Sequence, residues 1–243
     1  IIKEFDKLID MGVKTIRICD EMFLLNKRYY VPLCNLLKER GYGKFLNMWA
    51  YSRIDTVKDP ESLKLVREAG IKWLCLGIES GDRNVRLEAS KGKFEDVDVS
   101  HIVQRIHEAD IDVLANYIVG LPGETKESMQ TTLDLSMELC TRGWNMYAAT
   151  ALPGSRLYKS AVNAGHKLPK DYIGYSFHSY EALPLPTDAL EPAEILKFRD
   201  DAWTAYHTYE PFLDLIEEKS GAEAREDILK MTKVKLKRKI LGD

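Results

Sequence analysis

Helix-like and strand-like patterns alternate along the chain from its first residues to about residue 164. Apolar residues three and four positions apart are typical of amphipathic helices, whereas the short apolar runs between them are typical of buried strands. Parallel strands need a long crossover connection, which a helix usually supplies. Regular alternation therefore predicts a parallel sheet covered by helices, and 243 residues suffice for one barrel-like α/β domain.

The expected elements follow from this periodicity. Strands are predicted at residues 13–19, 45–49, 72–78, 113–119 and 144–150. Helices are predicted at 1–11, 26–40, 60–69, 97–109, 126–140 and 155–164. The alternation of strands and helices then ends, and we expect a less regular region at 165–192 with an edge strand at 176–183. Two helices are expected last, at 193–219 with a break at Pro211 and at 222–241.

The composition excludes several classes of protein. A net charge of −3 gives no field suited to nucleic acid, and no apolar run is long enough for a membrane span. No signal peptide opens the chain, so a cytoplasmic location is expected. Cys19, Cys34, Cys75 and Cys140 are widely spaced, which favours buried free thiols over disulfides or a metal site. The histidines also lack the spacing of metal ligands.

Two similar turns follow the last two predicted strands. Gly120-Leu-Pro-Gly123 precedes Glu124 and Thr125, either of which can cap the next helix. Leu152-Pro-Gly154 precedes Ser155 in the same way. Such turns expose peptide edges to a flat ligand, although two ordinary connections between strand and helix remain an alternative.

Polar residues follow every predicted strand. In a parallel α/β fold the carboxyl ends of the strands form the ligand-binding edge. The segments there are Asp20-Glu21, Tyr51-Ser52-Arg53, Glu79-Ser80-Gly81, 120–124 and 152–155. Carboxylates, an arginine and bare peptide edges together suit an amino-acid nucleoside. Asp20 and Glu79 as helix N-caps, and a surface pair between Arg53 and Asp55, are the alternatives.

The motifs at these positions resemble those of a known family. They are Asp20-Glu21-Met-Phe23, Ser52-Arg53-Ile-Asp55, Gly77-Ile-Glu79-Ser80-Gly81, Gly120-Leu-Pro-Gly-Glu124-Thr125 and Leu152-Pro-Gly-Ser155-Arg-Leu-Tyr158. In this order and spacing they are similar to the motifs of radical S-adenosylmethionine (SAM) enzymes, especially the branch that often carries an N-terminal cobalamin-binding domain. The resemblance implies a six-stranded partial TIM barrel in which a [4Fe-4S] cluster binds SAM and cleaves it reductively to a 5'-deoxyadenosyl radical.

The resemblance also implies roles for individual residues. Asp20 and Glu21 would hold the amino group of SAM, and Arg53 its carboxylate. Glu79 and Ser80 would contact the ribose or the methionine part. The backbone of two stretches would line the adenine, and these include Tyr117, Val119, Gly120, Ala151, Leu152 and Pro153. Catalytic residues and the substrate are not indicated, although Met48, Tyr147, Arg156 and the aromatic segment 172–180 lie where they would shape specificity.

One departure from the family is serious. The family holds its cluster with a Cys-x3-Cys-x2-Cys loop, and the four cysteines of this chain have no such spacing. The chain opens in what would be the first barrel helix, and its predicted strands number one fewer than the family's six. We expect a sequence cut just downstream of the cluster loop, whose product binds no cluster and is inactive by itself.

The predicted fold is thus an α/β partial (βα)6 TIM barrel that lacks its first strand. Residues 1–165 would form the barrel and residues 166–243 a mostly helical C-terminal extension packing on it. The Tyr172, Tyr175, Phe177 and Tyr180 rings are expected to pack across the barrel mouth, and Trp203, Tyr206, His207 and Tyr209 to form one packing face of a helix.

The first functional hypothesis is a radical SAM catalytic fragment acting on a small-molecule substrate, with an electron donor such as flavodoxin or ferredoxin and with cobalamin-dependent methyl transfer as one option. A non-redox barrel remnant that binds SAM or a nucleoside is the alternative. An aldolase-like barrel with a Schiff-base lysine is disfavoured, since Lys14 and Lys72 open their strands rather than end them.

Overall fold

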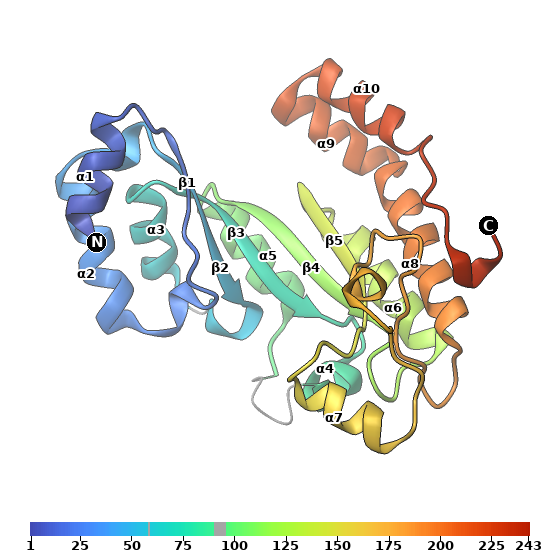
Figure 1. The fold of residues 1–243 in the computed structure, drawn as a ribbon. Coiled ribbons are helices and arrows are strands. Elements are labelled where there is room, and N and C mark those ends of the chain that lie inside the picture. Colours follow the sequence, from blue (N-terminus) through green and yellow to red (C-terminus); the bar gives the residue numbers. More distant parts are fainter. Residues whose placement is uncertain (58, 90–95) are drawn as a thin grey trace. The chain divides into compact units, whose positions relative to one another are not determined.

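The computed structural model describes residues 1–57, 59–89 and 96–243. Its strands form one five-stranded sheet in the sequence order β1-β2-β3-β4-β5 (Figure 1). The pairs β1–β2 and β2–β3 are parallel, and helices connect successive strands. The predicted class, a partial TIM barrel with five strands, is therefore confirmed.

The elements lie close to their predicted positions. The strands are β1 (Thr15–Arg17), β2 (Asn47–Arg53), β3 (Ile71–Glu79), β4 (Asp112–Val119) and β5 (Gly143–Ala148). The helices up to β5 and just beyond it are α1 (Ile2–Asp10), α2 (Lys27–Glu39), α3 (Pro60–Glu68), α4 (Arg83–Ala89), α5 (Val99–Glu108), α6 (Lys126–Leu139) and α7 (Arg156–Asn163). The later helices are α8 (Pro192–His207), α9 (Glu210–Ser220) and α10 (Ala222–Met231).

Short 3-10 helices complete the chain at η1 (Phe23–Leu25), η2 (Tyr42–Lys44), η3 (Ile54–Thr56), η4 (Tyr172–Tyr175) and η5 (Lys239–Leu241). The described residues fall into two compact units. The N-terminal unit holds residues 1–78 and 96–115, and the C-terminal unit holds residues 79–89 and 116–243. The functional division into a barrel at 1–165 and an extension at 166–243 stays a prediction.

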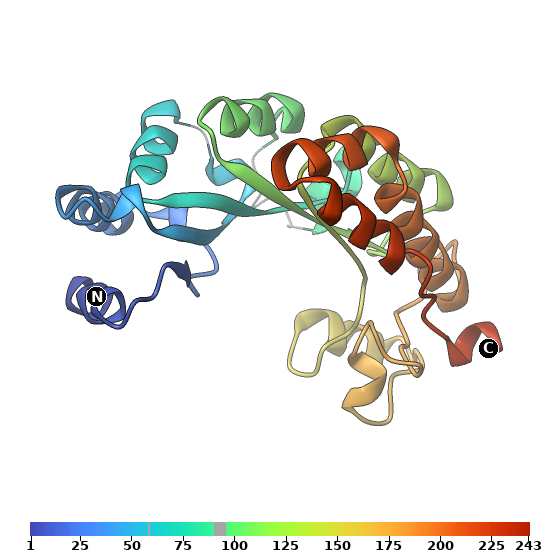
Figure 2. The ribbon, with the colours of Figure 1, turned by 90° about the horizontal axis from the view of Figure 1, so that it is seen from above.

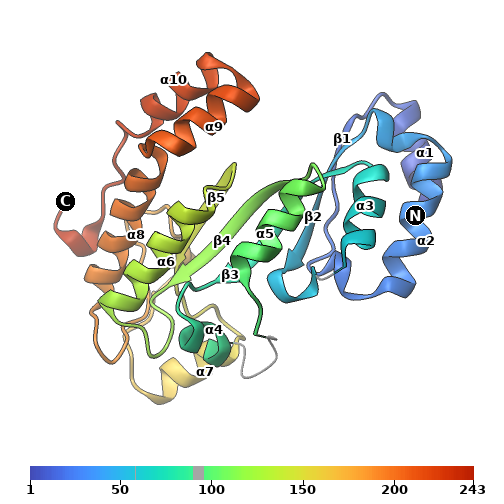
Figure 3. The same cartoon turned by 180° about the vertical axis from the view of Figure 1, so that it is seen from behind.

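The N-terminal unit is built on the alternation of β2. Met48, Ala50 and Ser52 are buried, whereas the residues between them are half-buried. This period of two is what a strand requires when one face packs against helices. Helices α2 and α3 lie side by side in this unit (Figure 3). On the other face of the sheet Trp49 stacks on Trp73, its partner in the parallel register, with ring centroids 4.7 Å apart.

The C-terminal unit packs α8 against β5. Trp144, Met146 and Ala148 are the buried residues of β5, and Trp144 stacks on Tyr206 of α8 with ring centroids 5.0 Å apart. The Tyr206 hydroxyl donates to the Thr141 carbonyl oxygen at 2.6 Å, so the buried phenol is satisfied. Helices α6 and α8 are neighbours (Figure 3). Tyr206 and His207 of α8 are buried, as expected of a packing face, whereas Tyr209, expected on the same face, lies beyond the end of α8.

Helices α9 and α10 lie against each other at the end of the helical region (Figure 2). Arg225 joins them, because its guanidinium donates to Glu210 at 2.6 Å and to Asp214 at 2.7 Å. The predicted break at Pro211 is confirmed, since α8 ends at His207 and Pro211 lies in the first turn of α9.

Three sequence-based expectations were wrong. Residues 176–183 form turns and irregular chain rather than an edge strand. The last helix ends at Met231 instead of residue 241, and residues 239–241 form a separate 3-10 helix, because Arg238 is held by Asp200 of α8. Cys19 is exposed rather than buried, since β1 already ends at Arg17. The short helix α4 was not predicted at all.

The described helices contain no segment that is both long and apolar enough to cross a bilayer.

Replacing Gly43 with alanine should destabilise the N-terminal unit strongly. A Cβ at Gly43 would lie 1.8 Å from the Glu68 carbonyl oxygen, so backbone must move. Gly41 offers a matched control, because its φ of 69° strains an alanine while no atom lies within 4 Å of the added carbon. Urea unfolding should show a loss of at least about 2 kcal/mol for Gly43→Ala and about 1 kcal/mol for Gly41→Ala. Equal losses would contradict this packing.

Candidate functional site

The turn after β1 is held by the end of β2. Asp20 does not cap a helix; its Oδ1 accepts from the backbone N–H of Met22 at 3.0 Å and closes a local turn. Leu24 N–H donates to the buried Ser52 Oγ at 3.4 Å. The segment that carries Asp20 and the exposed Glu21 is therefore tied to the strand end that carries Arg53.

Arg53 is the last residue of β2 and is already oriented by a partner. Its Nε and Nη2 donate to the two carboxylate oxygens of Asp55, both at 2.6 Å. Asp55 is 4% exposed, so this is not the surface pair considered from the sequence. A fork pair of this kind fixes the plane of the guanidinium. A ligand carboxylate would have to approach Arg53 along another edge of the guanidinium.

Glu79 ends β3 in a strained conformation. Its φ of 69° lies in the left-handed region, which costs an L-residue other than glycine about 1 kcal/mol or more. Strain of this kind is found disproportionately at ligand sites, where it aims a side chain that a relaxed backbone would turn elsewhere. Glu79 is not an N-cap of the following helix, since Asp82 supplies the side-chain oxygen that accepts from Val85 N–H at 3.0 Å.

The Glu79-Ser80-Gly81 turn is anchored by two residues that sequence reasoning missed. Thr132 Oγ1 on α6 accepts from Gly81 N–H at 2.9 Å and lies 3.1 Å from Ser80 Oγ. Buried Arg86 on α4 donates to the Ser80 carbonyl oxygen at 2.7 Å. Helix α4 is too short for a periodic pattern to reveal it, and the one signal in the sequence is an arginine six residues after Ser80.

The Gly-Leu-Pro-Gly turn after β4 folds back on its own glutamate. Glu124 Oε2 accepts from Leu121 N–H at 2.9 Å, and Thr125 rather than Glu124 caps α6. Gly120 has φ 78°, and a Cβ there would lie 2.7 Å from Ile195 Cγ2. Glycine is thus required at this position both by its backbone conformation and by the closeness of α8.

The two predicted adenine-lining stretches lie side by side. Ala149 N–H donates to the Val119 carbonyl oxygen at 2.8 Å. Leu152 is 55% exposed and Ala151 is buried. Tyr117 is fully buried, with its ring centroid 6.3 Å from that of Trp144, and Val119 is fully buried as well. The backbone contact of Tyr117 with an adenine, which the resemblance implied, therefore stays a prediction.

Glu124 carries the most perturbed electrostatics of the turn. Its side chain is fully buried, and within the described part of the chain Oε1 has no hydrogen-bond partner. Burial raises the pKa of the Glu124 carboxyl from 4.5 to about 7, and the backbone N–H groups of Leu121 and Gly120 offset this only in part. The carboxyl therefore holds a proton for part of the time at neutral pH.

A small hollow of about 190 Å³ lies beside this turn, lined by Pro122, Gly123, His166, Thr187 and Asp188 among others. This volume is below the range of about 300 Å³ and more that is typical of ligand pockets. The hollow is therefore not the site expected for a molecule as large as SAM.

The described residues do not fit an iron–sulfur cluster, because no group of three His, Cys, Asp or Glu side chains among them could hold a metal ion. They do fit parts of SAM. The N-terminal unit brings Asp20, Glu21 and Arg53 to neighbouring segments, where opposite charges suit an ammonium and a carboxylate. The C-terminal unit brings together Glu79, Ser80 and the paired stretches 119–124 and 149–153.

Stability should depend on the ionisation of Glu124. A pKa of about 7 in the folded state, against 4.5, means that the stabilising contribution is complete below pH 4.5 and is lost as pH rises through 7. Between pH 4.5 and pH 7.5 the free energy of unfolding of the natural protein, measured with urea, should fall by up to about 3 kcal/mol more than that of Glu124→Gln. Parallel pH profiles for the two proteins would contradict the burial of this acid.

A model of the radical SAM superfamily matches residues 1–136. The anaerobic magnesium-protoporphyrin IX monomethyl ester cyclase of Cereibacter sphaeroides is 27% identical over 181 residues, which cover 73% of this chain and 29% of that protein. The hopanoid C-2 methylase of Rhodopseudomonas palustris is 28% identical over 131 residues, which cover 53% of this chain and 25% of that protein. The chain thus spans less than a third of the length of these curated relatives.

Two solved structures share the fold. The radical SAM methyltransferase TsrM from Kitasatospora setae, with cobalamin and a [4Fe-4S] cluster bound, gives a TM-score of 0.61 at 20% identity over 70% of this chain and 34% of that one. The cobalamin-dependent SAM radical enzyme OxsB gives a TM-score of 0.56 at 10% identity, over 96% of this chain and 40% of that one. These likenesses support the partial TIM-barrel fold. Since the family model covers more than half of its length, the chain belongs to the radical SAM superfamily.

Proposed function

We propose that this chain forms the greater part of a radical SAM catalytic domain that binds SAM at the carboxyl ends of its strands and acts on a small-molecule substrate. The observation that carries the proposal is the hydrogen bond between Ala149 N–H and Val119 O. It places the turns that follow β4 and β5 side by side in the C-terminal unit, with Leu152 exposed beside them. Membership of the superfamily supplies the reaction class.

The residue roles in this proposal are the ones implied by the motifs. Asp20 and Glu21 bind the amino group of SAM, and Arg53, held in its plane by Asp55, binds the carboxylate. In the C-terminal unit Glu79 and Ser80 contact the ribose or the methionine part, while the backbone at 117–120 and 151–153 lines the adenine. When bound, SAM supplies a 5'-deoxyadenosyl group for radical chemistry, and the chain's task is to position that group and exclude water.

Methyl transfer is the reaction outcome that the related proteins support. A methylase and a methyltransferase stand among the proteins that this chain resembles, and the TsrM and OxsB structures contain cobalamin. We therefore propose a cobalamin-dependent methyl transfer, with an electron donor such as flavodoxin or ferredoxin and a cytoplasmic location. A non-redox binding module is not favoured, because the relatives named above are enzymes.

Replacing Glu21 with glutamine should weaken SAM binding. Glu21 is exposed at the end of β1, and removing its charge deletes one charge-assisted contact to the ammonium of SAM. We expect the dissociation constant to rise about tenfold by calorimetry. Glu39→Gln, an exposed acid at the end of α2, is the matched control and should leave it unchanged. Equal effects of both substitutions would remove Glu21 from the proposed site.

The 243-residue chain by itself should take up no cluster after anaerobic reconstitution with iron and sulfide, since its cysteines do not come together. We propose that the complete polypeptide carries a Cys-x3-Cys-x2-Cys loop before Ile1. That longer form should bind about one [4Fe-4S] cluster per chain and show its charge-transfer absorption. An upstream sequence without such a loop, or stable cluster binding by the 243 residues, would contradict this assignment.

A further inference from the structure

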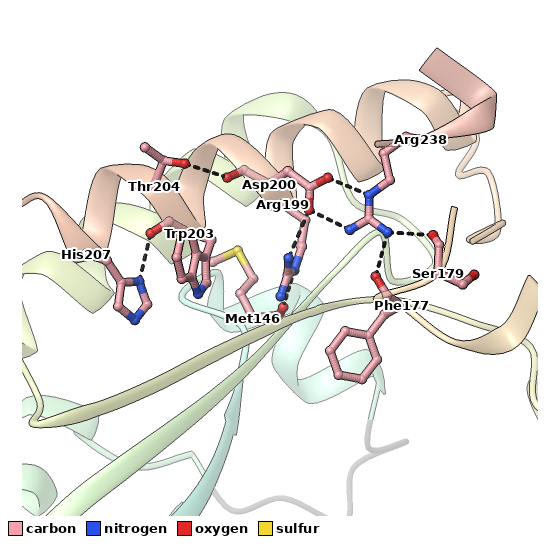
Figure 4. A network of polar contacts seen from close by, with 9 residues as sticks. All are labelled: Met146, Phe177, Ser179, Arg199, Asp200, Trp203, Thr204, His207 and Arg238. Atoms are coloured by element: carbon pink, nitrogen blue, oxygen red, sulfur yellow. Dashed lines mark hydrogen bonds and ion pairs between the residues drawn. The ribbon is translucent and has the colours of Figure 1, made fainter. Parts of the chain in front are cut away.

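The end of the chain is fastened to α8 by a buried arginine. The Arg238 side chain is fully buried, and its Nε and Nη2 donate to the two carboxylate oxygens of Asp200 at 2.8 and 2.9 Å (Figure 4). A fork pair of this kind sets direction as well as distance. The segment around Arg238 is therefore held in one orientation on α8.

The same guanidinium also holds a distant loop. Its Nη1 donates to the Phe177 carbonyl oxygen at 2.8 Å and to the Ser179 carbonyl oxygen at 2.9 Å (Figure 4). Tyr180 adds two contacts, since its carbonyl oxygen accepts from Lys239 N–H at 2.9 Å and its hydroxyl donates to the Asp243 carbonyl oxygen at 3.0 Å. We call residues 177–180, Asp200 and 238–243 the C-terminal latch.

Asp243 closes the latch from the other end. Its Oδ2 accepts from Arg238 N–H at 2.7 Å, and its own N–H donates to the Arg238 carbonyl oxygen. The last six residues thus form a compact hook around η5. This hook explains why sequence periodicity was misleading at 232–241, where a helix would carry Arg238 away from Asp200.

The latch fixes the side chain of Phe177. The Phe177 ring meets Tyr147 edge to face, with centroids 5.0 Å apart, and the Arg199 guanidinium lies 5.7 Å from the Phe177 centroid. Arg199 in turn donates to the Met146 carbonyl oxygen at 2.8 Å and to Asp200 Oδ1 at 2.9 Å. Asp200 is therefore shared by the two arginines that set the backbone and the ring of Phe177.

Tyr147 lies on the side of β5 where a ligand is expected. Trp144 and Met146 occupy the face that packs on α8, and Tyr147, between Met146 and the last strand residue Ala148, is half-buried on the opposite face. The turn that leads to Leu152 begins directly after it. Phe177 makes this contact from the aromatic segment, whereas Tyr172, expected to pack, is 87% exposed.

We propose that Arg238 is a positioning residue for the ligand site: it holds Phe177 against Tyr147, so that these two rings form a wall beside the turn after β5. The inference rests on the proposed SAM site in the C-terminal unit. It assigns to the last residues of the chain a part in ligand affinity, although none of them touches the ligand.

The test compares Arg238→Met, Phe177→Ala and Phe177→Tyr with a control, Lys237→Met, in the cluster-containing form of the protein. Lys237 is exposed, so its substitution removes the same charge without entering the latch. Hydrogen exchange at Ser179 and Ala182 N–H, both hydrogen-bonded within the loop, reports on the latch. Calorimetry measures the affinity for SAM, which depends on the wall that Phe177 and Tyr147 form.

We expect Arg238→Met to speed hydrogen exchange at these two amides at least tenfold and to weaken SAM binding about fivefold. Phe177→Ala, which leaves the latch groups in place, should weaken SAM to a similar extent, whereas Phe177→Tyr and Lys237→Met should bind normally. Faster exchange with unchanged affinity, or normal binding by Phe177→Ala, would overturn the inference while the proposed function stands. Absence of SAM binding by the natural protein would overturn the proposed function and this role with it.

Discussion

Backbone groups at the carboxyl ends of the strands must find hydrogen-bond partners once the sheet edge is covered, and this constraint organises the turns that follow β1, β3 and β4. Where strands end, ladder partners are lost, and side chains replace them. Ser52 accepts from Leu24 N–H, Thr132 from Gly81 N–H, and Glu124 from Leu121 N–H. Each of these three turns is therefore held by a side chain from elsewhere in its own unit or from its own helix start.

Turns anchored in this way are preorganised for binding. A ligand that meets loose loops must order them at a cost in affinity, whereas these turns already hold their peptide edges in place. The backbone strain at Glu79 is tolerated for the same reason, since Arg86 and Thr132 fix the residues after it. The raised pKa of Glu124 is a consequence of the same anchoring, because its carboxyl is buried beneath the turn that it holds.

The sequence predicts those features that depend on regular spacing. The alternation of strands and helices and the glycine-rich turn at Gly120 can both be read from residue patterns, because period and turn chemistry are local properties. Thr132 and Arg86 could not be found in this way, since each acts on a turn distant in sequence or from a helix too short to show a period. The lysine-rich segment 230–239 looked helical because charge composition does not reveal that one of its members, Arg238, is buried.

The two arginine–aspartate pairs, Arg53–Asp55 and Arg238–Asp200, make a common physical point. Removing a guanidinium from water costs several kcal/mol, so a buried ion pair contributes little net stability. What the pair does contribute is direction, because two parallel hydrogen bonds fix the plane of the guanidinium. In the N-terminal unit that plane is presented at a strand end; in the C-terminal unit it fixes the Phe177 backbone. An apolar pair of the same volume would lose this orientation at either place and would deprive the Phe177 and Ser179 carbonyl oxygens of the Arg238 donor.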